Sequence, residues 1–393
     1  MFNSDLYKKY LIENRRYFHM YPELSGEEYN TSNKICEELE KLNIEYYRLE
    51  YSQTSICAEI KGSGDKYCDK SVLLRADIDA LPIQEKTSHA FSSKNDGIMH
   101  ACGHDAHTAM LLCAAKILSE NKDKLNGNVR LIFEAGEEVG AFGKKISESE
   151  VLKDIASVFA IHVQEGIPSG KVSIQSGVRM AGAGFFKVVV HGEGGHGSSP
   201  DKGIDVIPAA AAMVMNLQTL VSREISPLDS CVVSVGTFNA GTKANIIADT
   251  AEFTGSLRFY NKKVQEYLPS AFKRIIENTA LAYRTSVDIM VGCGMPPIYN
   301  DMDCSEIAKK ALITLGCESS IYENQPSTGS DDFCYYLEKV PGIYAFLGVG
   351  KSANKKIYPA HNALFDIEED PLYLGAKLYV QYAVTFLEEA RNE

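Results

Sequence analysis

Long apolar runs are missing from this sequence, and so is any excess of positive charge. No stretch approaches about 18 consecutive apolar residues, so we expect no membrane-spanning helix. The first ten residues carry Asp5, Lys8 and Lys9 with no apolar core behind them, a pattern unlike that of a signal peptide. Lys and Arg number 40 against 52 Asp and Glu, which gives a net charge of −12. Because a field of that sign repels phosphate backbones, we expect no nucleic-acid partner.

Tryptophan is absent, and no repeat or low-complexity tract is visible. Ten cysteines without a signal peptide are typical of reduced thiols in a cytoplasmic protein rather than of a disulfide framework. Apolar residues make up 45% of the chain and charged residues 23%, which is ordinary globular composition. A length of 393 residues exceeds one ordinary hydrophobic core, so we expect two domains.

Apolar, β-branched runs alternate with helical patterns along much of the chain. The runs, each bounded by turn residues, are Val72–Ile78, Val129–Glu134, Val158–Val163 and Ile343–Gly348. Helical patterns lie between them, for instance at Ala106–Glu120 and Asp331–Leu337. This alternation predicts an α/β fold with a mainly parallel sheet and helices on both of its faces.

The pattern changes between about residues 181 and 296. Strands are expected at Phe185–His191, Cys231–Phe238, Thr250–Phe259 and Val287–Val291, and helices at Ile204–Ser222 and Val264–Tyr283. The order β-α-β-β-α-β is that of a ferredoxin-like α+β module. We therefore predict an inserted domain at 182–296 within a discontinuous domain formed by 1–181 and 297–393.

Residues capable of chemistry lie at or near the C-terminal ends of the predicted strands of the main sheet, or follow them. They are Asp77 and Asp79, Glu137 and Glu138, His162 and, further along the chain, His361. In open α/β sheets, the C-terminal edge of the strands is where sites assemble. Strand alternation puts Asp77 and Asp79 on one face. We expect Asp77 to orient a ligand or a water molecule, whereas turn capping before Pro82 also explains Asp79.

One short loop concentrates possible metal ligands. Three of the nine histidines and one cysteine fall within eight residues, at His100, Cys102, His104 and His107. In an extended loop, side chains two positions apart point to the same side, so Cys102 and His104 can hold a common metal ion. A thiolate ligand suits zinc and allows other borderline divalent ions. The spacing leaves open whether His100, Asp105 and His107 are functional or scaffold.

Two adjacent glutamates leave the strand that ends at Glu134. Hydrolysis by metal-activated water needs one carboxylate that binds the metal and another that removes a proton from the water. Glu137 and Glu138 can each take one of these two roles. The potential ligands on different elements are then Cys102, His104, Glu138, His162 and His361. Five ligands are enough for two metal ions that share a bridge. A thiol hydrolase with Cys102 as its nucleophile is a second interpretation of the same residues.

The predicted inserted domain adds three polar candidates. His196 stands in a run of glycines, where the backbone can be approached closely. Asn245 can supply an amide donor, and Arg258 can clamp a carboxylate. Turn geometry and surface charge explain these residues equally well on spacing alone.

Several motifs occur together, namely RADIDALP (75–82), MHACGHDAH (99–107), the pair Glu137 and Glu138, AIHV (160–163), GGHGSSPDKGIDVI (194–207) and the late His361. In order and spacing they resemble the amidohydrolase branch of the di-zinc aminoacylase/carboxypeptidase metallopeptidase family. That branch includes hippurate hydrolases, auxin-conjugate hydrolases, N-acyl-amino-acid amidohydrolases and N-acetyldiaminopimelate deacetylases. The resemblance covers nearly the whole chain. It implies a zinc-exopeptidase-like fold whose inserted module is a lid and forms a homodimer.

The resemblance implies a role for each matching residue. The metal-ligand positions fall on Cys102, His104, Glu138, His162 and His361. Glu137 matches the general base and Asp77 the supporting catalytic aspartate. His196 matches the lid histidine that reaches the partner subunit's site and stabilises the oxyanion. Arg75 stands where other branches carry a metal-binding histidine, which agrees with the use of Cys102 as a ligand.

The implied activity is metal-dependent hydrolysis of N-acyl amino acids, with acetyl, benzoyl or arylacyl groups, to a carboxylate and a free amino acid. Two divalent ions per subunit are implied, zinc first, with manganese, cobalt or nickel as alternatives. The alternative functions are an N-acetyldiaminopimelate-type deacetylase, a small-peptide carboxypeptidase and a metal-binding relative without turnover. The Ala-Gly before Glu137 and the Asn362-Ala363 after His361 depart from the commonest forms of the branch, so the substrate stays open.

Overall fold

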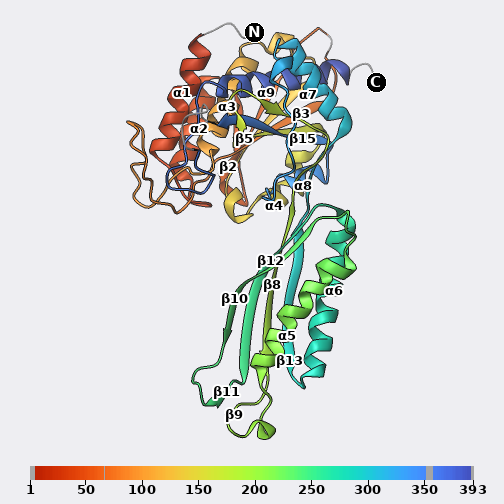
Figure 1. Cartoon of the computed structure of the whole chain (residues 1–393). Helices are drawn as coiled ribbons and strands as arrows, with labels where there is room; N and C mark the ends of the chain where they lie inside the picture. The colour runs from red at the N-terminus through yellow and green to blue at the C-terminus, as the bar shows by residue number, and fades with distance from the viewer. Residues whose placement is uncertain (1–4, 66, 351–356, 391–393) are drawn as a thin grey trace. The chain divides into compact units, whose positions relative to one another are not determined.

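The computed structural model describes residues 5–65, 67–350 and 357–390. The chain divides into two compact units (Figure 1). The larger unit comprises residues 1–179, 299–325 and 331–393, and the inserted unit comprises residues 180–298 together with 326–330. Nothing in the sequence pattern indicated that the short segment 326–330 groups with the inserted unit. Across the described residues, no helix combines the length and the apolar character needed to cross a membrane.

The larger unit is built on a seven-stranded sheet in the order β1-β2-β4-β3-β5-β15-β6. Its strands are β1 (Glu45–Leu49), β2 (Ser52–Lys61), β3 (Ser71–Asp77), β4 (Asn128–Glu134), β5 (Ile155–Pro168), β6 (Val172–Ser173) and β15 (Gly342–Gly350). The four central strands, β4, β3, β5 and β15, run parallel, while β1, β2 and β6 pair antiparallel at the edges. The predicted α/β fold with a mainly parallel central sheet is therefore confirmed.

Helices lie at both faces of this sheet, but unequally. The long ones, which share one hydrophobic core with one face, are α1 (Asp5–Met20), α2 (Tyr29–Lys41), α3 (His104–Ser119), α7 (Met302–Thr314) and α9 (Leu372–Glu389). Strand alternation decides which residues enter this core: Leu74 and Ala76 belong to it, whereas Arg75 and Asp77 point to the opposite face. The short helices α4 (Gly143–Ser147) and α8 (Cys334–Leu337) lie by that opposite face.

The helix predicted at Asp331–Leu337 is shorter than expected, because it begins only at Cys334. The two preceding aspartates form a turn instead. The Phe333 backbone N–H donates to Asp331 Oδ1 at 2.8 Å, and the Tyr344 hydroxyl donates to Asp331 Oδ2 at 2.6 Å. A short acidic side chain that bonds to nearby backbone competes with helix formation, so the first turn is lost.

The inserted unit is a four-stranded antiparallel sheet in the order β10-β12-β8-β13, with two helices on one face (Figure 1). In chain order its elements are β8 (Gly182–His191), α5 (Val206–Thr219), β10 (Cys231–Ala240), β12 (Thr250–Phe259), α6 (Lys262–Ala282) and β13 (Ser286–Met295). This confirms the predicted β-α-β-β-α-β order. Two unpredicted short ladders pair β9 (Gly195–His196) with β11 (Ile246–Ile247) and β7 (Gly177–Met180) with β14 (Ile298–Asn300).

Candidate metal centre and catalytic site

The loop before α3 brings Cys102 and His104 to the edge of the sheet. Gly103 lies between them at φ +98°, and a Cβ atom there would sit 2.3 Å from Val163 Cγ2. Only glycine combines that backbone conformation with so close an approach to β5. The helix that follows is rich in Ala and Leu and is almost entirely buried, so it holds the loop rigidly.

His104 is held with one ring nitrogen free. Its Nδ1 lies 3.1 Å from Asp79 Oδ1, while its buried Nε2 has no hydrogen-bond partner among the described residues. A carboxylate on Nδ1 fixes the tautomer in which Nε2 offers a lone pair, the usual arrangement of a metal-binding histidine. Asp79 Oδ2 also accepts the backbone N–H of Glu138 at 3.0 Å. Turn capping was also an explanation for Asp79. In the structure its carboxylate instead bonds to two predicted ligands, His104 and Glu138.

His162 and Cys102 face each other. The Nδ1 of His162 donates to the carbonyl of Val163 at 2.6 Å, so its Nε2 is again the free nitrogen. That Nε2 lies 3.5 Å from Cys102 Sγ. Burial and the neighbouring His107 lower the pKa of His162, which keeps the ring neutral and able to coordinate a metal.

Glu138 and His361 complete the predicted ligand set. His361 Nε2 lies 3.4 Å from Glu138 Oε1. The backbone N–H of His361 donates to the carbonyl of Ala101 at 2.7 Å, which ties this distant segment to the Cys102 loop. His361 is about half exposed and the others are largely buried, so one side of the cluster opens to solvent.

The ligand atoms form two groups that share Cys102. In one, Cys102, His104 and His162 have donor atoms within 4.8 Å of one another, and in the other Cys102, Glu138 and His361 do. Two overlapping triads that share Cys102 offer enough donor atoms for two divalent ions. The unpartnered, buried Nε2 of His104 fits the same interpretation, since an ion satisfies it at no further cost.

The protonation of Cys102 bears on the thiol-hydrolase alternative. Burial raises the pKa of the Cys102 thiol to about 12. A thiol with this pKa is protonated at neutral pH and is a poor nucleophile, whereas a divalent cation removes the proton outright. The surroundings of Cys102 therefore favour a ligand over a nucleophile.

Glu137 stands beside the ligands without belonging to either triad. Its carboxylate lies within 4.8 Å of donor atoms of His104 and Glu138. No hydrogen bond to it occurs within the described part of the chain, so it is free to bind a water molecule. Burial, then the charges of Asp331 and Asp332, raises the pKa of Glu137. A raised carboxyl pKa suits a group that must both accept and return a proton.

His107 supports the site rather than binding metal. Its Nδ1 lies 2.5 Å from Asp77 Oδ1, and its Nε2 accepts the backbone N–H of Val163 at 2.9 Å. Both ring nitrogens are thus used. Asp105 bonds to His19 at 2.8 Å and pairs with Arg15 at 3.0 Å, which makes it scaffold as well.

His100, the remaining histidine of the loop, is buried with no hydrogen-bond partner for either ring nitrogen among the described residues. Burial lowers its pKa to about 4, so the ring is neutral at physiological pH. It packs behind the loop as an uncharged side chain.

Sequence reasoning missed three acidic residues that lie close to these groups. Glu134, Asp331 and Asp332 all contact the buried guanidinium of Arg75. Asp332 is 257 positions from Arg75, and its neighbourhood was predicted to be helical. No spacing rule connects residues so far apart, so no signal for them was available from one sequence.

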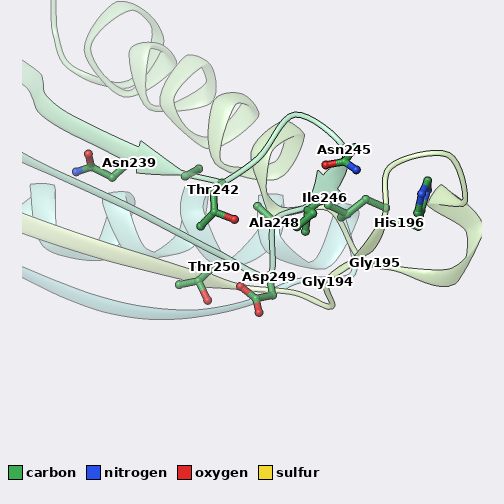
Figure 2. A pocket seen from close by; sticks show the side chains of 13 residues that line it. Gly194, Gly195, His196, Asn239, Thr242, Asn245, Ile246, Ala248, Asp249 and Thr250 are labelled. Carbon is green, nitrogen blue, oxygen red and sulfur yellow. The ribbon is translucent and has the colours of Figure 1, made fainter.

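The inserted unit has a cavity of about 760 Å³ that His196 and Asn245 line together (Figure 2). The Nδ1 of His196 accepts the backbone N–H of Ser198 at 3.1 Å, so the neutral ring carries its proton on Nε2, ready to donate. Arg258 does not line this cavity. It lies eight residues along β12 from Thr250 at the cavity, a separation of about 26 Å in a strand.

A mainly parallel α/β sheet with a thiol, imidazoles and carboxylates that could hold metal ions at one edge, beside a further glutamate, fits a metal-dependent amidohydrolase. The family model described as Peptidase family M20/M25/M40 matches residues 73–385. The chain belongs to this family.

Three curated relatives match over nearly the whole chain. Thermostable carboxypeptidase 1 of Saccharolobus solfataricus is 38% identical over 96% of this chain and 95% of its own length. N-acetylcysteine deacetylase of Bacillus subtilis is 36% identical over 96% and 97%. IAA-amino acid hydrolase ILR1-like 2 of Arabidopsis thaliana is 39% identical over 98% and 87%.

Two solved structures share the fold. A putative aminohydrolase from methicillin-resistant Staphylococcus aureus has a TM-score of 0.91 at 34% identity, with 97% of each chain covered. A dinuclear metal-binding peptidase of the M20 family from Bacillus subtilis has a TM-score of 0.86 at 33% identity, with 98% of this chain and 99% of the other covered.

Proposed function

We propose that this protein hydrolyses the amide bond of N-acyl amino acids, releasing a carboxylate and a free amino acid. The observation that carries the proposal is Glu137, a partly buried carboxylate that accepts no hydrogen bond within the described residues and lies next to two triads of possible metal-ligating atoms. Two divalent ions are proposed, zinc first because a thiolate and imidazoles are among the ligands, with manganese, cobalt or nickel as alternatives. A metal-binding relative without turnover has no use for a base in that position.

Each residue of the site has a separate role in the proposed reaction. The two triads, Cys102 with His104 and His162 and Cys102 with Glu138 and His361, would hold two divalent ions, whose chemistry would be to polarise the scissile carbonyl and to lower the pKa of water toward ~7. Glu137 takes a proton from the attacking water and delivers it to the leaving nitrogen as the C–N bond breaks. His196 donates from Nε2 to the oxyanion. Asn245 and Arg258 are proposed to hold the substrate from different subunits, because about 26 Å of strand separates Arg258 from the cavity that Asn245 lines in the same chain. Asp77 orients the site through His107.

Relatives support acyl amino acids as the substrate class. One is named for the deacetylation of N-acetylcysteine and another for the hydrolysis of IAA-amino acids. A second candidate function, a small-peptide carboxypeptidase, is supported by the name of the relative from Saccharolobus solfataricus. An N-acetyldiaminopimelate-type deacetylase differs from the first proposal only in its substrate.

A substrate panel on protein of measured metal content tests the proposal. Acetyl, benzoyl and indole-acetyl derivatives of several amino acids, N-acetyldiaminopimelate and unblocked dipeptides are incubated with the enzyme, and the released amine is quantified. We expect acyl amino acids to be cleaved with kcat/KM at least about tenfold above that for dipeptides. A preference for dipeptides would favour the carboxypeptidase, and no cleavage of any substrate by metal-loaded protein would favour the silent relative.

We further propose that the protein is a cytoplasmic homodimer in which His196 serves the partner subunit's site. All ten cysteines are free, which supports a reducing compartment. Exposure of His196 at a cavity of the inserted unit leaves it available to a second chain.

Subunit mixing tests this arrangement. Glu137→Gln and His196→Ala are each expected to be nearly inactive alone. Co-expressed, they should recover about one quarter of the parent activity, because half of randomly paired dimers are hybrids and each hybrid holds one complete site. If His196 acts within its own subunit, the mixture stays as inactive as its parts.

A further inference from the structure

Arg75 is a completely buried guanidinium on the side of β3 that faces the site. Its Nη1 lies 2.6 Å from Asp77 Oδ2, its Nε 2.7 Å from Glu134 Oε2, and its Nη2 3.0 Å from Asp332 Oδ1. Asp331 Oδ1 lies 3.4 Å from the same Nη2. One cation therefore joins carboxylates from two neighbouring strands and from the turn before α8.

Three of these four carboxylates, all except Glu134, make a further bond that leads toward the site. Asp77 bonds to His107, which in turn accepts the backbone N–H of Val163 beside His162. Asp332 Oδ2 accepts the backbone N–H of Gly143 at 3.1 Å, where α4 begins just after the turn that carries Glu137. Asp331 accepts the Tyr344 hydroxyl on β15, the strand paired with His162.

The position at the centre of these four carboxylates requires arginine. Burial alone lowers the pKa of Arg75, but the charges of Asp331, Asp77, Glu134 and Asp332 raise it well above its usual value. A planar guanidinium offers five N–H donors at fixed angles, so it can hold three carboxylates in one geometry. The ammonium group of a lysine carries the same charge but has no planar arrangement of N–H donors at fixed angles.

We propose that Arg75 is a positioning residue of the reaction centre. It sets Asp77, and through His107 the segment of His162, and it sets Asp332, which anchors the segment that follows Glu137. The two branches end on different functions. Asp77 and His107 lead to the metal ligands, whereas Asp332 leads to the general base. The catalytic part of this inference rests on the proposed function, while its metal-binding part does not.

The alternative is a buried ion-pair network that serves folding alone. Removing one partner of such a network commonly costs several kcal/mol. Thermal stability therefore cannot distinguish the two roles. Metal affinity, the cobalt spectrum and the division of an effect between kcat and KM can.

Arg75→Lys, which keeps the charge and removes the planar arrangement of N–H donors, is the first test. The zinc dissociation constant is measured by chelator competition and the ligand field by cobalt absorption, alongside kcat and KM. We expect zinc affinity to fall about 10–100-fold, as for other groups that orient metal ligands. The cobalt bands should shift and kcat should fall about tenfold or more, with KM within about threefold.

Arg130→Lys is the matched control. Arg130 lies on β4, pairs with Glu59 at 3.2 Å and donates to the carbonyls of Val151 and Lys153. None of these partners belongs to the site. Zinc affinity, the cobalt spectrum and kcat should therefore stay at the parent values.

Asp332→Asn tests the second branch and keeps the proposal falsifiable if Arg75→Lys does not fold. Asp332 uses one oxygen for Arg75 and the other for the Gly143 N–H, and an amide of the same shape keeps only one of these two oxygens. We expect kcat to fall at least about tenfold, with the zinc dissociation constant within about threefold of the parent value. A parent-like kcat in folded Asp332→Asn would overturn the branch to Glu137.

A folded Arg75→Lys with lower melting temperature but parent zinc affinity, cobalt spectrum and kcat would overturn the positioning role altogether. This outcome differs from failure of the proposed function. If the parent enzyme cleaves no acyl amino acid, zinc affinity and the cobalt spectrum still decide whether Arg75 positions the metal ligands.

Discussion

Glu137→Gln is expected to lower kcat about 10²–10⁴-fold while the protein keeps its metal. The glutamine side chain has nearly the same shape and can still bond to a water molecule, but it cannot take up the proton. Since Glu137 belongs to neither triad that shares Cys102, its loss as a charge should leave the bound ions in place. The measurement is kcat on the best substrate of the panel, paired with metal content by elemental analysis.

Glu138→Gln is the matched control, because the two glutamates are adjacent and differ only in their neighbours. Glu138 lies with Cys102 and His361 in one triad, so its replacement should lower metal content as well as activity. The roles assigned here would be wrong if Glu137→Gln stayed within tenfold of the parent rate. They would be exchanged if Glu137→Gln, and not Glu138→Gln, lost metal.

Metal removal is expected to lower kcat/KM about 10³-fold or more, and addition of zinc, manganese, cobalt or nickel should restore it to different extents. Carbonyl polarisation and water activation are each worth several kcal/mol, and every 1.36 kcal/mol is a factor of ten in rate. Dialysis against a chelator, followed by titration with each ion, measures the loss and the recovery.

The same experiment decides the role of Cys102. A thiol hydrolase would keep its activity in the presence of the chelator, and it would lose that activity on alkylation whether or not metal is present. In a metal enzyme, bound ions should protect Cys102 from alkylation, because its sulfur belongs to both triads. Chelated protein should then react faster than metal-loaded protein. Full activity after complete removal of metal would contradict the metal-dependent mechanism.

The parts that the sequence predicted well are local. The central strands follow from short apolar runs, and the order of the inserted unit follows from alternating periods of two and 3.6 residues. Cys102 and His104 are two positions apart in a glycine-containing loop, and Glu137 and Glu138 are neighbours. In each case the chain itself brings the groups together. Parallel strands also explain why groups on separate strands, such as Asp77 on β3 and His162 on β5, come close together.

The parts that the sequence did not predict depend on faces and on long-range contacts. Asp79 was also explained as a turn residue, but it bonds to His104 and to the backbone of Glu138. His107 was an open candidate, and its two bonds assign it to support. Spacing shows only that a histidine can reach a site. Whether its nitrogens are free depends on the partners that surround it.

By itself the sequence determined which candidate residues share a loop or a sheet edge, because neighbours along the chain and parallel strands leave little choice; that they carry the chemistry stays a prediction. Only the tertiary structure decided how those residues are held. Arg75, Glu134 and the pair Asp331 and Asp332 meet across as many as 257 positions. A buried charge needs counter-charges close to it. Which residues supply them depends on the tertiary fold, and no local sequence pattern predicts it.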